Sequence, residues 1–293
     1  MAAEQDHALA WCYLGQVYHN GAAVERDLAK AVMYWRLAAD KDHAQSQCYL
    51  AQAYHDGEGV EKDLAQAFRL WHLAADQREP KAQCHLAQAY HDGEGVKRDL
   101  ALAVHFWLQA AKQGETGAQY KLGESYYFGE GVEKDLDQAV KYWRLAADKG
   151  DLNSQFYLAF VHYVGQGVEK DLDLALKYWS VGAQSDDPQC QFYLGLLYFK
   201  GEGVEKDLDR AVEYFRLAAA QDDPEALFYL GYLHREGQGL PKDLERAVEY
   251  WLRAAAVDQP QALFALGQAH YEGELFPKDL DRAVEYWLRA ARL

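Results

Sequence analysis

The sequence is built from one motif that recurs every 36 residues along almost the whole chain. The repeat is clearest in the segments YHDGEGVEKDL, which starts at Tyr54, and YHDGEGVKRDL, which starts at Tyr90. Three markers keep this spacing eight times: an aspartate before a leucine, a large aromatic residue eight positions later, and a leucine upstream of both. A period of this length predicts stacked units that bury one another's apolar faces. The aspartates are Asp27, Asp63, Asp99, Asp135, Asp171, Asp207, Asp243 and Asp279; the aromatic residues are Trp35, Trp71, Trp107, Trp143, Trp179, Phe215, Trp251 and Trp287; the leucines are Leu14, Leu50, Leu86, Leu122, Leu158, Leu194, Leu230 and Leu266.

Each repeat contains the signals of two helices joined by a glycine turn. In the sixth repeat, Asp187 and Pro188 are typical of a helix start, and Gly201 and Gly203 permit the turn that follows. Asp207 then caps a second helix. We therefore expect an all-α fold, a right-handed α/α superhelical solenoid of eight helix-turn-helix repeats in a single repeat domain, residues 1–293. The expected repeats cover approximately residues 6–41, 42–77, 78–113, 114–149, 150–185, 186–221, 222–257 and 258–293.

Helical periodicity gives each first helix of a repeat a core face and an open face. With 100° per residue, Leu14 faces the second helix of its repeat, and the small residue Gly15 allows a neighbouring helix to approach closely. Cys12, Gln16 and His19 lie on the opposite side. We expect that side to line the concave surface.

These residues resemble the Sel-one-like repeat family, a subclass of the tetratricopeptide-like solenoids. The resemblance covers about residues 6–293. It implies α/α superhelices that act as adaptors and bind proteins or peptides. One cysteine-rich branch of the family closes each hairpin with a disulfide and is linked to penicillin binding, but this chain lacks two cysteines per repeat. The fourth repeat carries the family pattern as Ala118, Leu122, Gly123, Tyr126, Gly129, Glu130, Gly131, Val132, Asp135, Ala139, Trp143, Ala146 and Ala147.

Composition narrows the class of partner. The net charge of −16 argues against nucleic acid, whose phosphates require clustered Lys and Arg. No stretch approaches the roughly 18 apolar residues of a membrane span, so no membrane insertion is expected. The segment from Met1 to His7 lacks a basic stretch before an apolar one. We therefore expect a cytoplasmic protein, or a secreted or periplasmic one if a signal peptide has been trimmed.

The glycine turns and histidines carry no recognisable chemistry. GEGV recurs in near-copies without the pattern of a phosphate-binding loop, which favours a structural turn. His19, His55 and His91 occupy one repeat position, and stacked helices lie roughly 8–10 Å apart, which is too far for ligands of one metal ion. The same spacing argues against disulfides among Cys12 and its equivalents. No nucleophile stands beside a base outside the repeat pattern, so neither a cofactor nor enzyme activity is expected.

The open face changes character along the chain. Repeats 1–3 place Cys, Gln and His on it, whereas repeats 5–7 place mostly aromatic residues there. Apolar patches and aromatic anchors mark interaction sites, so we expect a partner segment to bind this groove. The alternative is that these rings pack sideways between adjacent first helices and only stabilise the stack. The predicted protein- or peptide-binding residues are Phe156, Phe160, Tyr163, Phe192, Leu196, Phe199, Phe228, Tyr232 and Arg235.

Two other functional interpretations stay open. One is a protein that binds or hydrolyses cell-wall fragments or β-lactams, and the other is a designed, consensus-like scaffold.

Two features of the eighth repeat lead to separate structural predictions. Its second helix keeps the apolar face of internal copies, which predicts that part of Trp287 and Leu288 is exposed, and either end-to-end self-association or a chain that is truncated at its C-terminus. Its turn has Leu275 where seven repeats have Gly or Ala, which predicts a different turn with Phe276 at the usual valine position.

Overall fold

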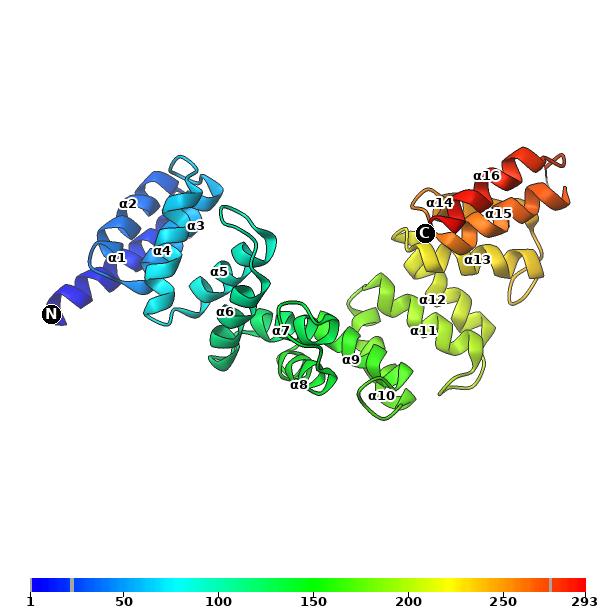
Figure 1. Cartoon of the computed structure of the whole chain (residues 1–293), viewed down its shortest axis with the longest axis horizontal. Coiled ribbons are helices and arrows are strands. Elements are labelled where there is room, and N and C mark those ends of the chain that lie inside the picture. The colour runs from blue at the N-terminus through cyan, green and yellow to red at the C-terminus, as the bar shows by residue number, and fades with distance from the viewer. Residues whose placement is uncertain (1, 22–23, 274–275) are drawn as a thin grey trace. The chain divides into compact units, whose positions relative to one another are not determined.

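The protein folds entirely into helices in the part of the chain that the structure describes (Figure 1). The structure is a computed structural model that describes residues 2–21, 24–273 and 276–293, with side chains from residue 7 onward. Each predicted repeat contributes two helices, which confirms the expected all-α repeat architecture. The helices are α1 Ala2–Asn20, α2 Leu28–Ala39, α3 Ala44–Asp56, α4 Leu64–Asp76, α5 Pro80–Asp92, α6 Leu100–Lys112, α7 Thr116–Phe128, α8 Leu136–Ala147, α9 Leu152–Val164, α10 Leu172–Gln184, α11 Pro188–Lys200, α12 Leu208–Ala220, α13 Pro224–Glu236, α14 Leu244–Ala255, α15 Pro260–Glu272 and α16 Leu280–Ala291.

The chain divides into two compact units, residues 1–154 and 155–293, and each is described by itself. In the first unit, helices pair as hairpins from α1 with α2 to α7 with α8, and in the second from α11 with α12 to α15 with α16. The second helix of one hairpin packs on the first helix of the next, as α2 does on α3 and α14 on α15. Every repeat joint within a unit is therefore a contact between a second helix and a first helix.

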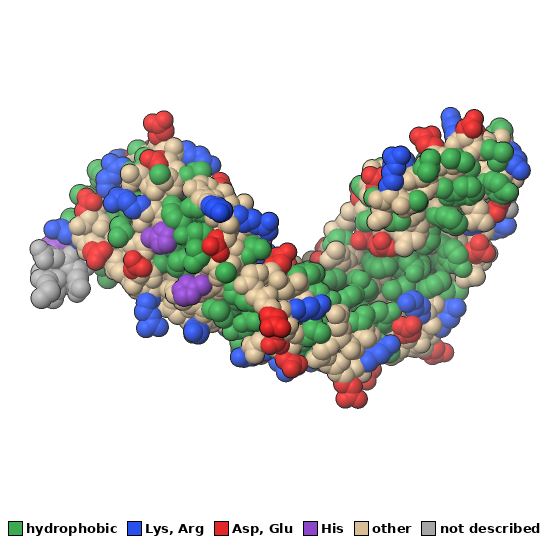
Figure 2. Space-filling view, in the orientation of Figure 1, with side chains coloured by type: hydrophobic (Ala, Val, Ile, Leu, Met, Phe, Trp, Pro, Cys, Tyr) green, Lys and Arg blue, Asp and Glu red, His purple; other side chains and the backbone are tan. Residues whose placement is uncertain are grey.

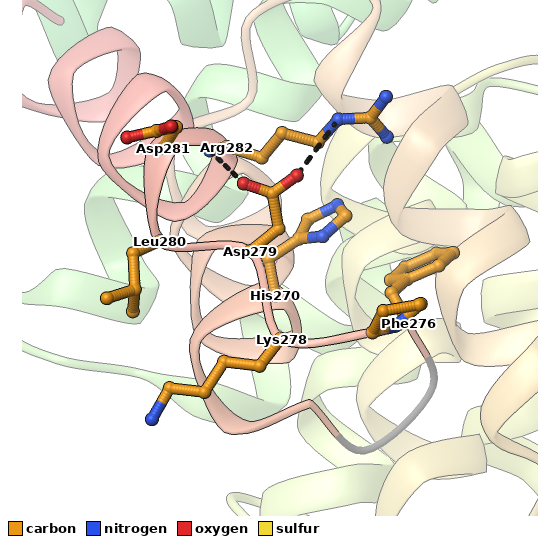
Figure 3. Close-up of a pocket in the computed structure, with 8 residues that line it drawn as sticks. His270, Phe276, Lys278, Asp279, Leu280, Asp281 and Arg282 are labelled. Carbon is orange, nitrogen blue, oxygen red and sulfur yellow. Dashed lines mark hydrogen bonds and ion pairs between the residues drawn. The ribbon is translucent and has the colours of Figure 1, made fainter.

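Aspartates start the second helices in the way that the sequence predicts. Asp135 accepts a hydrogen bond from the backbone N–H of Gln138 at 3.0 Å, which satisfies one of the free donors at the start of α8. Figure 3 shows the same arrangement in α16, where the carboxylate of Asp279 also lies 3.6 Å from Nε of Arg282. The expected cap of α11 is confirmed too, because Asp187 accepts from the N–H of Cys190 at 2.7 Å.

Glycines make the turn between the two helices of a repeat. Gly57 ends α3 in the left-handed region with a φ of 75°, and Gly59 has a φ of 71°. A Cβ atom on Gly59 would overlap the carbonyl group of Leu28 in the preceding repeat, so the turn also requires a close backbone approach. The GEGV segment is thus a structural element at this position.

The turn of the eighth repeat can be followed only at its end, because Leu275 lies outside the described residues. Phe276 packs against the core of the second unit, as Leu240 does in the seventh repeat. Its ring stacks on that of His270 with 4.5 Å between the ring centroids. A larger side chain therefore fills the place of the usual valine.

The core of each hairpin centres on its large aromatic residue. The side chains of Trp143 and Trp179 are fully buried. In the fourth repeat, a Cβ atom at Gly123 would overlap the Trp143 ring, so glycine is required there as the ring is placed, and no repeat has a residue larger than alanine at this position. At the end of the second unit, Trp287 is only half-buried, as the sequence predicts.

Leu288 is exposed as the sequence predicts, but not because a covering helix is absent. It is 53% exposed, but its internal equivalent Leu252 is 46% exposed, so the exposure belongs to this repeat position and not to the chain's last helix. The residue beside Trp287 that loses its cover at this end is Val284, which the sequence analysis did not name.

Candidate protein-binding groove

The open face of the first unit is polar, but Cys12 and Cys48, which the sequence placed on it, are buried in the core. α1 and α3 place Gln16 and Gln52 on it, where they line a cavity of about 580 Å³ together with Trp35 and Tyr49. Gln16 donates a hydrogen bond to the hydroxyl of Tyr49 at 2.8 Å, and Gln52 donates to the carboxylate of Asp56 at 2.6 Å. Several polar groups of this surface therefore have partners within the unit, but Oε1 of Gln52 and Nε1 of Trp35 are buried at the cavity without a hydrogen-bond partner among the described residues.

The three histidines of this face each lie close to a glutamate of the next repeat. Nδ1 of His55 lies 2.6 Å from Asp56, and Nε2 lies 3.2 Å from Glu94 in the turn of the next repeat. His19 faces Glu58 at 3.4 Å, and His91 faces Glu130 at 3.8 Å, in the same manner. Figure 2 shows histidine side chains at the surface of the first unit. The stripe acts as a series of clamps between repeats.

The clamp at His55 shifts the pKa of both partners. Burial alone lowers the pKa of His55, but its hydrogen bonds with Asp56 and Glu94 outweigh that effect and raise the pKa above its ordinary value. For Asp56, burial acts to raise the pKa, and the hydrogen bonds from Gln52 and His55 outweigh it and lower the pKa. Each group is thus held in its charged form.

The predicted groove residues of the second unit lie on the equivalent positions of three first helices. Contacts between helices connect several of them: Phe199 on α11 meets Tyr232 on α13 edge to face at 6.3 Å between centroids. Figure 2 shows hydrophobic side chains gathered over α11 and α13. α9 carries Phe156, Phe160 and Tyr163; α11 carries Phe192, Leu196 and Phe199; α13 carries Phe228, Tyr232 and Arg235.

Burial divides these nine residues into two groups. Phe192 and Leu196 are each only 7% exposed and belong to the core cluster of the second unit. The other seven are half-buried, so they keep some of their surface open after packing against neighbours. Phe192 and Leu196 thus form the packed floor, and the half-buried residues make the accessible surface.

Comparison with known proteins agrees with this arrangement of repeats. The sequence model of the Sel1 repeat matches eight times, at residues 8–43, 44–78, 80–115, 116–151, 152–187, 188–223, 224–257 and 260–293. The chain belongs to the Sel1 repeat family.

Solved structures of other Sel1 repeat proteins share the fold. A protective antigen of uropathogenic Escherichia coli with an SLR fold is 30% identical over 99% of this chain, with a TM-score of 0.82. A Sel1 repeat protein of Oxalobacter formigenes is 32% identical over 89% of this chain and 75% of its own, with a TM-score of 0.69. This chain spans 62% of the length of the E. coli antigen. Among curated proteins, none is similar enough to count as a match.

Two aromatic residues that organise the groove of this Sel1 repeat protein were not among the predicted site residues. Tyr193 stacks on Trp179 at 4.5 Å between centroids, and it also touches Phe156 and Phe160. Tyr229 has the same role in the next repeat, where it stacks on Phe215 at 5.2 Å. The signal was available, because at five of the seven joints an aromatic ring stands fourteen residues after the large aromatic residue of the preceding repeat; the exceptions are Lys121 and Ala265.

The aromatic face also continues beyond the predicted residues. Phe264 and Tyr271 of α15 occupy the equivalent positions in the eighth repeat and are 56% and 48% exposed. The predicted site ended at the seventh repeat, and in the eighth repeat Gln268 lies between these two residues in the sequence.

Arg235 is already engaged within this Sel1 repeat unit. Its guanidinium donates to the carboxylate of Glu272 at 3.1 Å and lies 3.9 Å from Glu236. A carboxylate of a ligand would therefore compete with Glu272 for the guanidinium.

The other side chains that could act as nucleophiles or metal ligands are buried or lie apart from one another. Burial raises the pKa of the Cys48 and Cys84 thiols to about 12, so neither is a reactive nucleophile at neutral pH. His234 and His270 lie in the core, where each ring stacks on a tyrosine of the next helix at 5.8 Å. Among the described residues, no three His, Cys, Asp or Glu side chains are close enough to hold a metal ion. In the same stretch of the chain, no helix is long and apolar enough to cross a lipid bilayer.

Proposed function

We propose that this chain is a non-enzymatic adaptor that binds a protein or peptide, and that the aromatic face of its second unit contacts the partner. The Sel1 repeat fold is typically a protein-interaction scaffold, which supports the class of function. Phosphate-backbone partners are disfavoured by the net charge of −16. Four free cysteines suit a reducing compartment, so we assign the adaptor to the cytoplasm.

One observation carries the choice of surface. Six aromatic side chains on α9, α11 and α13 remain half-buried although their neighbours pack against them: Phe156, Phe160, Tyr163, Phe199, Phe228 and Tyr232. Apolar ring surface that still contacts water gains free energy when a partner covers it, at about 25 cal/mol per Å². Large aromatic residues are also the usual anchors of protein interfaces.

The partner segment is extended or helical and presents apolar side chains to these rings. Elsewhere it is neutral or basic, because the adaptor is strongly acidic. Lys200 contributes to the rim of the groove, where its ammonium donates to the hydroxyl of Tyr163 at 3.0 Å.

Alanine variants test the proposal. The strongest binder from a peptide library is titrated against the wild type and against Tyr232→Ala and Phe228→Ala, whose side chains are half-buried. Each truncation is expected to cost about 1–3 kcal/mol of binding free energy. The matched control is Gln52→Ala on the polar face, which should leave the affinity unchanged.

Phe192→Ala separates binding from lateral packing. If it lowers the melting temperature while Tyr232→Ala and Phe228→Ala leave the affinity per folded molecule unchanged, the rings only stabilise the stack and the proposal is wrong. A nitrocefin turnover assay on the same protein tests the enzymatic alternative, and turnover that survives purification would contradict the adaptor.

A further inference from the structure

The first and last helices expose the two halves of the contact that joins neighbouring repeats inside each unit. On α16 the uncovered residues are Leu280, Val284 and Trp287, called here the C-terminal face. On α1 they are Tyr13 and Leu14, called the N-terminal face. Within the units, the equivalent side chains of a second helix and of the next first helix cover each other.

The C-terminal face is apolar surface that an internal repeat buries. Val284 is 50% exposed, whereas Val248 at the same position of α14 is 6% exposed. Leu280 is 53% exposed, and Figure 3 shows it pointing away from His270 and Phe276. The twelve-residue sequences of α14 and α16 differ only by Glu245 against Asp281. α16 therefore offers the surface that α14 buries against α15.

The N-terminal face is the complementary half. Leu14 is 39% exposed, whereas Leu50 at the same position of α3 is 4% exposed. Tyr13 is 58% exposed, whereas its equivalent Tyr49 is half-buried. The side chains are the same as inside the unit, and only the covering helix differs.

Ring stacking fixes how the two halves fit. Across internal joints, Trp35 stacks on Tyr49 at 5.3 Å and Trp179 stacks on Tyr193 at 4.5 Å between centroids. The corresponding rings are Trp287 on the C-terminal face, which is half-buried, and Tyr13 on the N-terminal face, which is exposed. Each face thus carries the half of the stack that the other lacks.

We propose that a second copy of this chain docks on the C-terminal face through its own N-terminal face, with Tyr13 of one copy stacked on Trp287 of the other. The contact reproduces the joint between internal repeats, and it is independent of the aromatic groove. Because the two faces differ, the association is head to tail and continues beyond a dimer.

Light scattering of the 293-residue chain from micromolar to millimolar concentration tests the proposal. The weight-average mass of the wild type is expected to rise with concentration beyond twice the monomer mass. Val284→Asp and Tyr13→Asp each disable one face and should stay monomeric. Mixed together, they retain one intact face of each kind and should form a dimer and nothing larger.

The controls keep the outcome decisive. Val257→Asp, at a position that is 63% exposed outside both faces, should associate like the wild type. Far-ultraviolet circular dichroism checks that each variant is folded, and Leu280→Asp replaces Val284→Asp if helicity is lost. A wild type that stays monomeric, a Tyr13→Asp chain that still dimerises, or a mixture that stays monomeric would each overturn the head-to-tail contact.

Discussion

The open faces of the two units are built from the same repeat positions but handle their side chains differently. In the first unit, Gln16, Gln52 and His55 bond to groups of their own or the next repeat, although Oε1 of Gln52 and Nε1 of Trp35 have no hydrogen-bond partner in the part of the chain that the structure describes. In the second unit, rings such as Phe228 and Tyr232 pack sideways and still keep some of their surface open. A polar face can satisfy many of its hydrogen-bonding groups internally, whereas a row of large rings on separated helices leaves apolar area uncovered. The repeat fold fixes the direction of the side chains at these positions. Whether the side chains are polar or aromatic decides which face lowers its free energy when a partner covers it.

The largest expected difference between the two faces is in stability. Phe192→Ala removes a ring that is 7% exposed and touches Phe215 and Tyr229, so it should lower the free energy of unfolding by about 3–5 kcal/mol. Gln52→Ala removes a surface hydrogen bond and should stay within about 0.5 kcal/mol of the wild type. Urea unfolding followed by circular dichroism measures both. Equal effects would show that the two faces are packed alike.

A smaller effect is expected where the first unit's face holds itself together. Tyr49→Phe keeps the ring that stacks on Trp35 but removes the hydroxyl that accepts from Gln16. The expected loss is about 0.5–1.5 kcal/mol of unfolding free energy. In a double-mutant cycle with Gln16→Ala, the second substitution should cost little once the first is present. Fully additive costs would mean that the hydrogen bond contributes nothing to the joint between the first two repeats.

The smallest expected effect is on the pH dependence of stability. The raised pKa of His55 means that its clamp contributes fully below the ordinary value of 6.5 and is lost as the pH rises through the raised value. Asp56 acts in the opposite direction and at lower pH, since its lowered pKa gives a contribution that disappears only in acid. His55→Gln should therefore flatten the stability profile around neutral pH by less than about 1 kcal/mol, the range of exposed ion pairs.

The control for this pH effect is His105→Gln, an exposed imidazole of the same unit outside the groove. Melting temperatures taken across the neutral range for the wild type and both variants check it. A profile that changes as much with His105→Gln as with His55→Gln would rule out the clamp.

Local features of the sequence predicted the fold well because each one acts within a few residues. The aspartates cap the second helices, the glycines take the left-handed turns, and small residues such as Gly123 accommodate the adjacent tryptophan. Prediction failed where two repeats meet. The burial of Phe192 depends on Tyr229 in the following repeat, and the helical wheel of a single helix contains no such neighbour. The exposure of Val284 was missed for the same reason, because it depends on whether a helix of a following repeat covers this residue.

The central claim is that the aromatic face, and not the polar one, contacts a partner. Hydrogen exchange measured by mass spectrometry, with and without the strongest peptide from the library, compares both faces in one molecule. The account predicts slower exchange of backbone amides in α11 and α13 and in 156–163 of α9, with no change in α1, α3 and α5. Protection confined to α1, α3 and α5 would contradict it and assign the partner to the polar face.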